Sequence, residues 1–147
     1  MSTQNIVEQL NTELARTYSL SLAAKQAHWN VEGENFMEVH ELLDKVSTQL
    51  REVADELAER VSALGSIPIA LAATLAGTNI SDDFPIRKIT TKEALSLFSN
   101  YLRDEVSQLA DLAKSIGDTD LITQDICIEA ARSLAKTQWF LASHLGN

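Results

Sequence analysis

Five side chains that could bind a metal ion lie close together in this 147-residue sequence: His28, His40, Asp44, Asp55 and Glu59. A set of imidazole nitrogens and carboxylate oxygens suits iron, manganese or zinc, and it lacks the thiolates that favour copper(I). Because carboxylates stabilise Fe(III) more than Fe(II), iron bound to such a set would be readily oxidised. The residue types therefore raise the hypothesis of a transition-metal site.

Four of these residues belong to one predicted helix, and their spacing places them on one face of it. With His40 at zero and about 100° per residue, the three carboxylates fall at about 40°, 60° and 100°. The apolar residues from Val39 to Leu64 recur in steps of four and three and centre at about −95°, on the side that a helix in a bundle buries. The ligand face therefore points roughly 145° away from the expected core.

One helix cannot bring all four residues to one metal ion. Asp44 and Asp55 are separated by about 16 Å along the helix axis, whereas metal–ligand bonds are about 2 Å long. His40 with Asp44, and Asp55 with Glu59, are therefore two half-sites. Antiparallel packing against the same helix of an identical subunit, about a two-fold axis near residues 49–50, would join them into two equivalent sites.

A simpler interpretation is open for each of these residues taken alone. Charged residues on an outer helix face are usually only solvated, and His28 shares a face with Leu10 and Leu14, where a hydrogen-bonded, half-buried histidine is ordinary. Their occurrence on one face, opposite the apolar stripe, favours a metal site that His28 could complete. A di-iron site inside one bundle is excluded, because the sequence has no Glu-x-x-His pair.

The apolar spacing predicts an all-α fold with four long helices. Glycines and prolines gather at a few points, among them Gly33, Gly65 and Pro68, and between these points apolar residues recur every three or four positions. Asn35 with Glu38, and Thr90 with Glu93, have the spacing of capping boxes at two helix starts. The predicted helices cover residues 4–31, 36–64, 90–116 and 120–145.

A connection of about 25 residues joins the second predicted helix to the third, which is unusually long for a compact domain. One long crossover is typical of the ferritin-like four-helix bundle. Ile69 to Ala76 could form a short extra helix within the crossover. No change in composition divides the chain, so residues 1–147 are expected to form a single domain.

Composition narrows the choice of compartment. The single cysteine, Cys127, cannot form an internal disulfide, and the N-terminus lacks a basic segment followed by an apolar one, so a cytoplasmic protein is expected. Cys127 lies in an apolar stretch, where a packed thiol is expected. The most apolar segment, Ile67 to Leu75, is far too short to span a bilayer.

The net charge of −9 argues against a general nucleic-acid binder, which needs a clustered basic surface. Residues 1–12 and 142–147 contain no Lys or Arg, and the only adjacent basic pair is Arg87 with Lys88. Direct DNA binding is therefore expected to be weak or absent.

Several motifs resemble those of the Dps family, the bacterial DNA-binding proteins from starved cells, also called mini-ferritins. The segment from His28 to Phe36 reads HWNVEGENF, and it is followed by H-x-x-x-D at His40 and D-x-x-x-E at Asp55, with the family's spacing. The match is dense over residues 25–65, and chain length and helix order agree throughout.

The resemblance implies a hollow dodecamer with ferroxidase centres at its two-fold interfaces. His28, His40 and Asp44 would come from one subunit, and Asp55 and Glu59 from its neighbour. Fe(II) would be oxidised, preferably by hydrogen peroxide, and stored as ferric oxide in the cavity, which would protect the cell and its DNA from oxidative damage. Zinc could occupy the same ligands.

The resemblance also bears on residues outside the ligand set. Trp29 matches a tryptophan that the family holds beside the site, although packing in the core would explain it equally well. Asp120, Asp125 and Glu129, at the start of the last predicted helix, match the segment that lines three-fold pores and draws in Fe(II). Asp125 and Glu129 lie about 40° apart on a helix, whereas Asp118 and Asp120 could simply cap it.

Two functions of other classes stay open. One is an architectural, DNA-compacting role, for which the family is named, and the other is a non-catalytic helical interaction module with a merely acidic face. Members that bind DNA generally use flexible tails rich in Lys and Arg, which argues against the first. Stoichiometric binding of Fe(II) would exclude the second.

Overall fold

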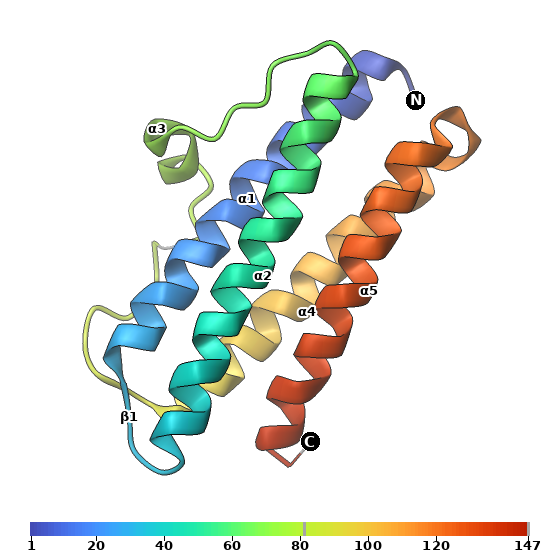
Figure 1. The fold of residues 1–147 in the computed structure, drawn as a ribbon. Helices are drawn as coiled ribbons and strands as arrows, with labels where there is room; N and C mark the ends of the chain where they lie inside the picture. The colour runs from blue at the N-terminus through green and yellow to red at the C-terminus, as the bar shows by residue number, and fades with distance from the viewer. Residues whose placement is uncertain (81, 147) are drawn as a thin grey trace.

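Four long helices account for most of the chain in the computed structural model, which describes residues 1–80 and 82–146 (Figure 1). A short helix interrupts the crossover, and a single 3-10 turn, η1, precedes the last helix. The predicted bundle is confirmed, and each predicted boundary of a long helix lies within one residue of the observed one. The elements are α1 (Thr3–Asn30), α2 (Phe36–Ala63), α3 (Ala72–Ala76), α4 (Thr91–Ile116), η1 (Gly117–Thr119) and α5 (Leu121–His144).

The long helices form two antiparallel hairpins, because α1 packs along α2 and α4 packs along α5 (Figure 1). The crossover runs the length of the bundle, so α2 and α4 point in the same direction (Figure 1). Two short parallel strands, β1 (Val31–Glu32) and β2 (Ile89–Thr90), tie the turn of the first hairpin to the start of α4. Asn11 of α1 holds the other end of the crossover, since its Oδ1 accepts a hydrogen bond of 2.8 Å from the backbone N–H of Ile69.

The start of α4 and the end of α2 agree with the sequence predictions, whereas the start of α2 does not. Thr90 and Glu93 form the predicted capping box, with bonds of 3.0 and 2.8 Å between each side chain and the other residue's backbone N–H. Gly65, with a φ of 78°, follows the end of α2. The capping box predicted for Asn35 and Glu38 is wrong: Asn35 has a left-handed backbone, φ 58°, and its side chain caps nothing. A side chain reaches the first turn of a helix from an extended backbone, which Asn35 lacks.

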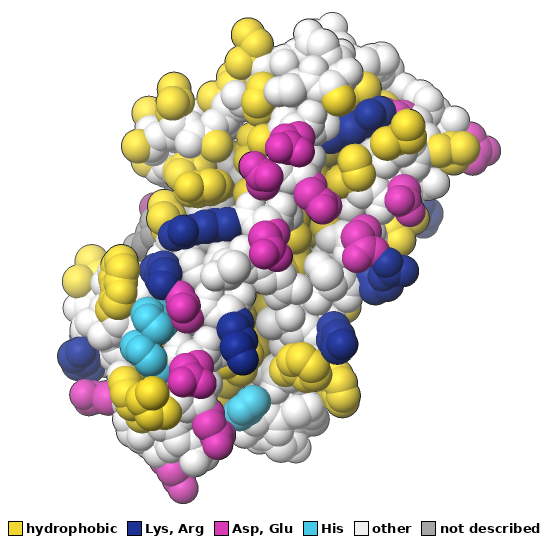
Figure 2. All heavy atoms as spheres, viewed as in Figure 1, with side chains coloured by type: hydrophobic (Ala, Val, Ile, Leu, Met, Phe, Trp, Pro, Cys, Tyr) yellow, Lys and Arg dark blue, Asp and Glu magenta, His cyan; other side chains and the backbone are white. Residues whose placement is uncertain are grey.

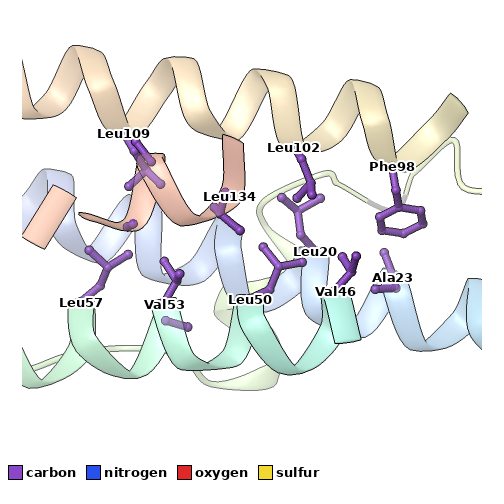
Figure 3. Close-up of a cluster of buried hydrophobic side chains, with 14 of the residues drawn as sticks. Leu20, Ala23, Val46, Leu50, Val53, Leu57, Phe98, Leu102, Leu109 and Leu134 are labelled. Atoms are coloured by element: carbon purple, nitrogen blue, oxygen red, sulfur yellow. The ribbon is translucent and has the colours of Figure 1, made fainter. Parts of the chain in front are cut away.

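The core lies between the two hairpins and takes side chains from all four long helices (Figure 3). Cys127 of α5 is completely buried, as predicted for a packed thiol. Within the described residues, no helix is long and apolar enough to cross a membrane. Fully buried side chains in the core include Leu20, Leu50, Leu57, Phe98, Leu102, Leu109 and Leu134.

Candidate metal centre

His28 and His40 lie side by side at the turn of the first hairpin, where α1 ends and α2 begins. Their rings are stacked, with centroids 3.7 Å apart and planes inclined by 16°. Nδ1 of His28 lies 2.7 Å from the carbonyl oxygen of His40, and Nδ1 of His40 lies 2.8 Å from the carbonyl oxygen of His28. This reciprocal pair of contacts fixes both rings against the backbone.

These contacts determine which ring nitrogen carries the proton. A carbonyl oxygen only accepts hydrogen bonds, so each Nδ1 must donate one. In a neutral imidazole the Nε2 atom then keeps its lone pair, and neither Nε2 has a hydrogen-bond partner among the described residues. Metal-binding histidines commonly have this arrangement, in which one ring nitrogen donates to a carbonyl and the other is free for the ion.

One aromatic ring packs on the histidine pair, and a second aromatic residue is its neighbour in the sequence. The ring of Phe36 stacks on His40, with centroids 5.0 Å apart and planes inclined by 28°. Trp29 follows His28 directly and is 64% exposed, so the core packing considered for Trp29 is wrong. The histidine pair therefore lies beside apolar surface that the single chain leaves uncovered.

Asp44 lies one helical turn beyond His40 and pairs with Lys25 of α1 through its Oδ1 and the Nζ of Lys25. The hydrogen bond from Lys25 lowers the pKa of Asp44, and the positive charge of Lys25 acts in the same direction, against the opposing effect of burial. The carboxylate is thus ionised and already holds an internal cation. Lys25 was not among the predicted site residues, although its place one turn before His28 was a signal that could have found it.

Asp55 and Glu59 lie further along α2, exposed, and neither makes a side-chain hydrogen bond or an ion pair with another described residue. Within residues 1–80 and 82–146, no group of three or more His, Cys, Asp or Glu side chains is arranged to hold one ion. Figure 2 shows two adjacent histidines beside an acidic and a basic side chain, and a separate gathering of acidic side chains over α2 and α5. The structure therefore separates the predicted ligand residues of one chain into two groups.

Asp120 caps α5 and forms an ion pair with Arg60 of α2. Its Oδ1 accepts a 3.0 Å hydrogen bond from the backbone N–H of Thr123, and Nη2 of Arg60 donates to both carboxylate oxygens, at 3.0 and 2.8 Å. Burial alone would raise the pKa of Asp120, but the bonds from Thr123 and Arg60 outweigh burial and lower the pKa to about 2. The capping role considered for Asp120 is confirmed, so the pore hypothesis depends on Asp125 and Glu129.

Asp125 and Glu129 are exposed one turn apart on α5, and Glu129 pairs with Arg132. Together with Glu56 and Glu59 of α2, they line a hollow of about 520 Å³ between the two helices. A ligand candidate and the pore candidates therefore border the same hollow. Spacing along one helix could not show this, because the residues belong to different helices.

Comparisons with known proteins agree with this fold. The family described as the ferritin-like domain matches residues 7–147. The chain is similar to the fine tangled pili major subunit of Haemophilus ducreyi, with 36% identity over 97% of this chain and 75% of that protein. It is also similar to the DNA protection during starvation protein of Mycolicibacterium smegmatis, with 31% identity over 96% of this chain and 77% of that protein.

A solved structure of Dps from Microbacterium arborescens, in the high iron form, superimposes with a TM-score of 0.92 at 30% identity. The superposition covers 99% of this chain and 95% of that one. The chain therefore belongs to the ferritin-like family and, within it, to the Dps proteins. The ferritin-like fold expected from the long crossover is confirmed.

Proposed function

We propose that this protein oxidises Fe(II) and stores the ferric product, with iron as its substrate and cargo. The reciprocal bonding of His28 and His40 carries the proposal, because it leaves the Nε2 lone pairs of both rings without a hydrogen-bond partner among the described residues, with the ionised carboxylate of Asp44 one helical turn beyond His40. Membership of the ferritin-like family supports iron handling at the level of the family. The relative from Microbacterium arborescens has been solved in a high iron form.

The ligands would be shared between two subunits. His28, His40 and Asp44 of one subunit would face Asp55 and Glu59 of the partner subunit across an antiparallel contact of two α2 helices. The separation of about 16 Å between the half-sites along α2 supports this arrangement. A two-fold contact then gives two equivalent sites, and we propose that twelve one-domain subunits close into a hollow shell.

The chemistry would proceed at these mixed ligands. Two Fe(II) ions would each lose one electron, and hydrogen peroxide would accept both as its O–O bond breaks to give two hydroxide ions. Carboxylates stabilise the Fe(III) that forms. Consumption of Fe(II) together with peroxide would remove the reagents that generate hydroxyl radicals, in the reducing cytoplasm that the single buried Cys127 suits. Zinc could occupy the same ligands without turnover.

Iron would reach the site through openings lined by acidic residues. Asp125 and Glu129 are exposed on α5 and border the hollow that Glu59 also lines, so they would attract Fe(II) toward the second half-site. Rings of Asp or Glu commonly make such openings selective for cations. Asp120 contributes less, because Arg60 neutralises its charge.

An anaerobic titration with Fe(II), followed by oxidation with peroxide or with oxygen, tests the proposal. Stoichiometric binding is expected, with faster oxidation by peroxide and a native mass of twelve subunits. An inert helical module would bind no Fe(II) in stoichiometric amounts, and that result would refute the proposal.

Protection of DNA, which the name of the Mycolicibacterium smegmatis relative gives for that protein, would here be indirect. Affinity for DNA depends largely on Lys and Arg contacts to phosphate, and a chain with a net charge of −9 starts from repulsion. We expect no retardation of DNA in a gel at physiological salt without magnesium. Tight retardation that weakens with salt would favour the DNA-compacting role instead.

A further inference from the structure

Two glutamates are buried inside the bundle, and neither belongs to the proposed ligand set. Glu13 of α1 is 6% exposed, and Glu105 of α4 is completely buried. An ionised carboxylate loses its hydration when it is buried, so it is normally found there only with a cation or several hydrogen bonds. The partners of these two residues therefore decide their charge state.

Glu105 has such partners. Its Oε2 accepts a hydrogen bond of 2.7 Å from Nε of Arg16, and its Oε1 accepts one of 2.6 Å from the hydroxyl of Thr17. The side chain of Arg16 is 23% exposed, and it extends from α1 to the buried carboxylate of Glu105. Glu105 can therefore stay ionised against the cost of burial.

Glu13 has no comparable partner. Its Oε2 is buried and has no hydrogen-bond partner within residues 1–80 and 82–146. With the Gln108 amide turned so that its oxygen faces Arg16, that oxygen accepts bonds of 2.9 and 3.0 Å from the two terminal guanidinium nitrogens. The contacts of Arg16 thus go to Glu105 and Gln108, and no hydrogen bond or ion pair joins Arg16 to Glu13 among the described residues.

The other helices supply no compensating charge among the described residues. Cys127 of α5 is buried nearby, and burial, then Glu13 and Asp120, raise the pKa of its thiol to about 12, so it stays neutral. The buried residues of α2 are apolar apart from Ser47. On α5, Asp120 is already paired with Arg60.

We propose that Glu13 and Glu105 form a proton-binding device in the bundle core, in which the folded subunit holds Glu13 as a neutral acid and is weakened when that proton leaves. Burial, and then the charge of Glu105, raise the pKa of Glu13 from 4.5 to about 7, against the opposing effect of Arg16. Burial also raises the pKa of Glu105, whereas the hydrogen bonds from Thr17 and Arg16 lower it.

The sign of the pH dependence follows from these values. The unfolded chain releases the proton of Glu13 near pH 4.5, whereas the folded chain keeps it until about pH 7. Between these values the folded state binds more protons, so stability falls as the pH rises, and the loss is complete above pH 7. A carboxylate such as Glu93, whose pKa lies at about 2, has the opposite effect and loses its contribution only in acid.

Unfolding of the assembled, iron-free protein between pH 5 and pH 8 tests the device, with Glu13→Gln as the variant. Glu8→Gln is the matched control, because Glu8 is exposed on the same helix. From pH 5 to pH 8 the unfolding equilibrium of the wild type should rise on the order of 10- to 100-fold relative to that of Glu13→Gln. Glu8→Gln should follow the wild type. Parallel curves for the wild type and Glu13→Gln would overturn the proposal.

Infrared spectroscopy locates the proton without requiring a variant to fold. The wild type at pH 6 should show the C=O stretch of a protonated carboxylic acid, which should disappear as the pH passes about 7. Absence of this band at pH 6 would overturn the proposal. If the band persists in Glu13→Gln, the proton resides on Glu105 and the assignment to Glu13 is wrong. Neither measurement uses iron, so the outcome is independent of the proposed ferroxidase activity.

Discussion

The two proposed half-sites differ in how the subunit holds them. His28 and His40 are fixed by reciprocal bonds to backbone carbonyls, and Asp44 is held by Lys25. Asp55 and Glu59 are exposed and make no side-chain hydrogen bond or ion pair among the described residues. The first half-site is therefore ordered within one chain, whereas the second would gain its geometry only on binding.

This difference separates two contributions to binding. Ligands that are already ordered lose little conformational freedom when an ion arrives, whereas each exposed carboxylate must be immobilised at that moment. An exposed pair is also free to adapt to a partner surface. We therefore expect the histidine half-site to set the position of the ion, and the carboxylate half-site to complete its coordination.

The largest effect is expected from removing either half-site. His40→Ala/Asp44→Ala and Asp55→Ala/Glu59→Ala should each slow Fe(II) oxidation more than about 100-fold, beyond the loss typical of changes around a metal ligand. If the site is shared, refolding an equal mixture of the two variants should restore about a quarter of the wild-type rate. About half of the dimers would then be hybrids, and one of the two sites in each hybrid is intact. Stopped-flow oxidation with peroxide measures both rates.

A charge-matched control belongs with this experiment. Asp104→Ala/Asp111→Ala removes two exposed carboxylates from α4 and should leave the oxidation rate unchanged. Recovery of wild-type activity after refolding of the wild type alone shows that refolding succeeds. Under those conditions, a mixture with no activity above that of the separate variants would refute the shared site.

A smaller effect is expected from neutralising the two acidic residues of α5 that border the same hollow as Glu59. Asp125→Asn/Glu129→Gln should slow iron uptake up to about tenfold at low salt, and the effect should shrink as ionic strength rises, because screening weakens attraction of Fe(II). Uptake followed at several salt concentrations, with native mass to show that the shell is intact, measures this. An unchanged rate at low salt would remove both residues from the uptake route.

The smallest effect is expected from replacing Lys25, whose ammonium group pairs with Asp44 of the first half-site. Lys25→Met should tighten anaerobic Fe(II) binding roughly 2- to 5-fold, which corresponds to the loss of a partly exposed ion pair that competes for Asp44. Lys45→Met is the matched control, because Lys45 is exposed on α2. Isothermal titration measures both affinities. Weaker binding in Lys25→Met would mean that Lys25 orients Asp44 for iron instead of competing with it.

The long helices and the face of α2 could be predicted because both depend on local periodicity. Apolar stripes, glycines and one capping box place the helix boundaries within one residue. The second capping box failed at Asn35, because its left-handed backbone is set by the turn after α1 and not by the residue type alone. Local patterns thus predict helices better than the turns between them.

The contacts across helices could not be predicted. The bonds between His28 and His40 depend on how α1 and α2 are aligned, which the connecting turn sets. Glu13 lies among apolar neighbours on α1, and this position could have marked it as buried. Its lack of a partner depends on Arg16 turning toward Glu105, a contact between residues 89 positions apart.

The two-rung ladder between β1 and β2 has a consequence for the order of folding. It joins Val31 to Ile89, whereas the bonds of the histidine pair join residues only 12 positions apart. Closing a longer loop costs more entropy, and contacts between neighbouring segments generally form first. The histidine pair therefore belongs to a hairpin that can form while the rest of the chain is still being synthesised. The strands β1 and β2 can pair and fasten the crossover only after Ile89 and Thr90 have emerged.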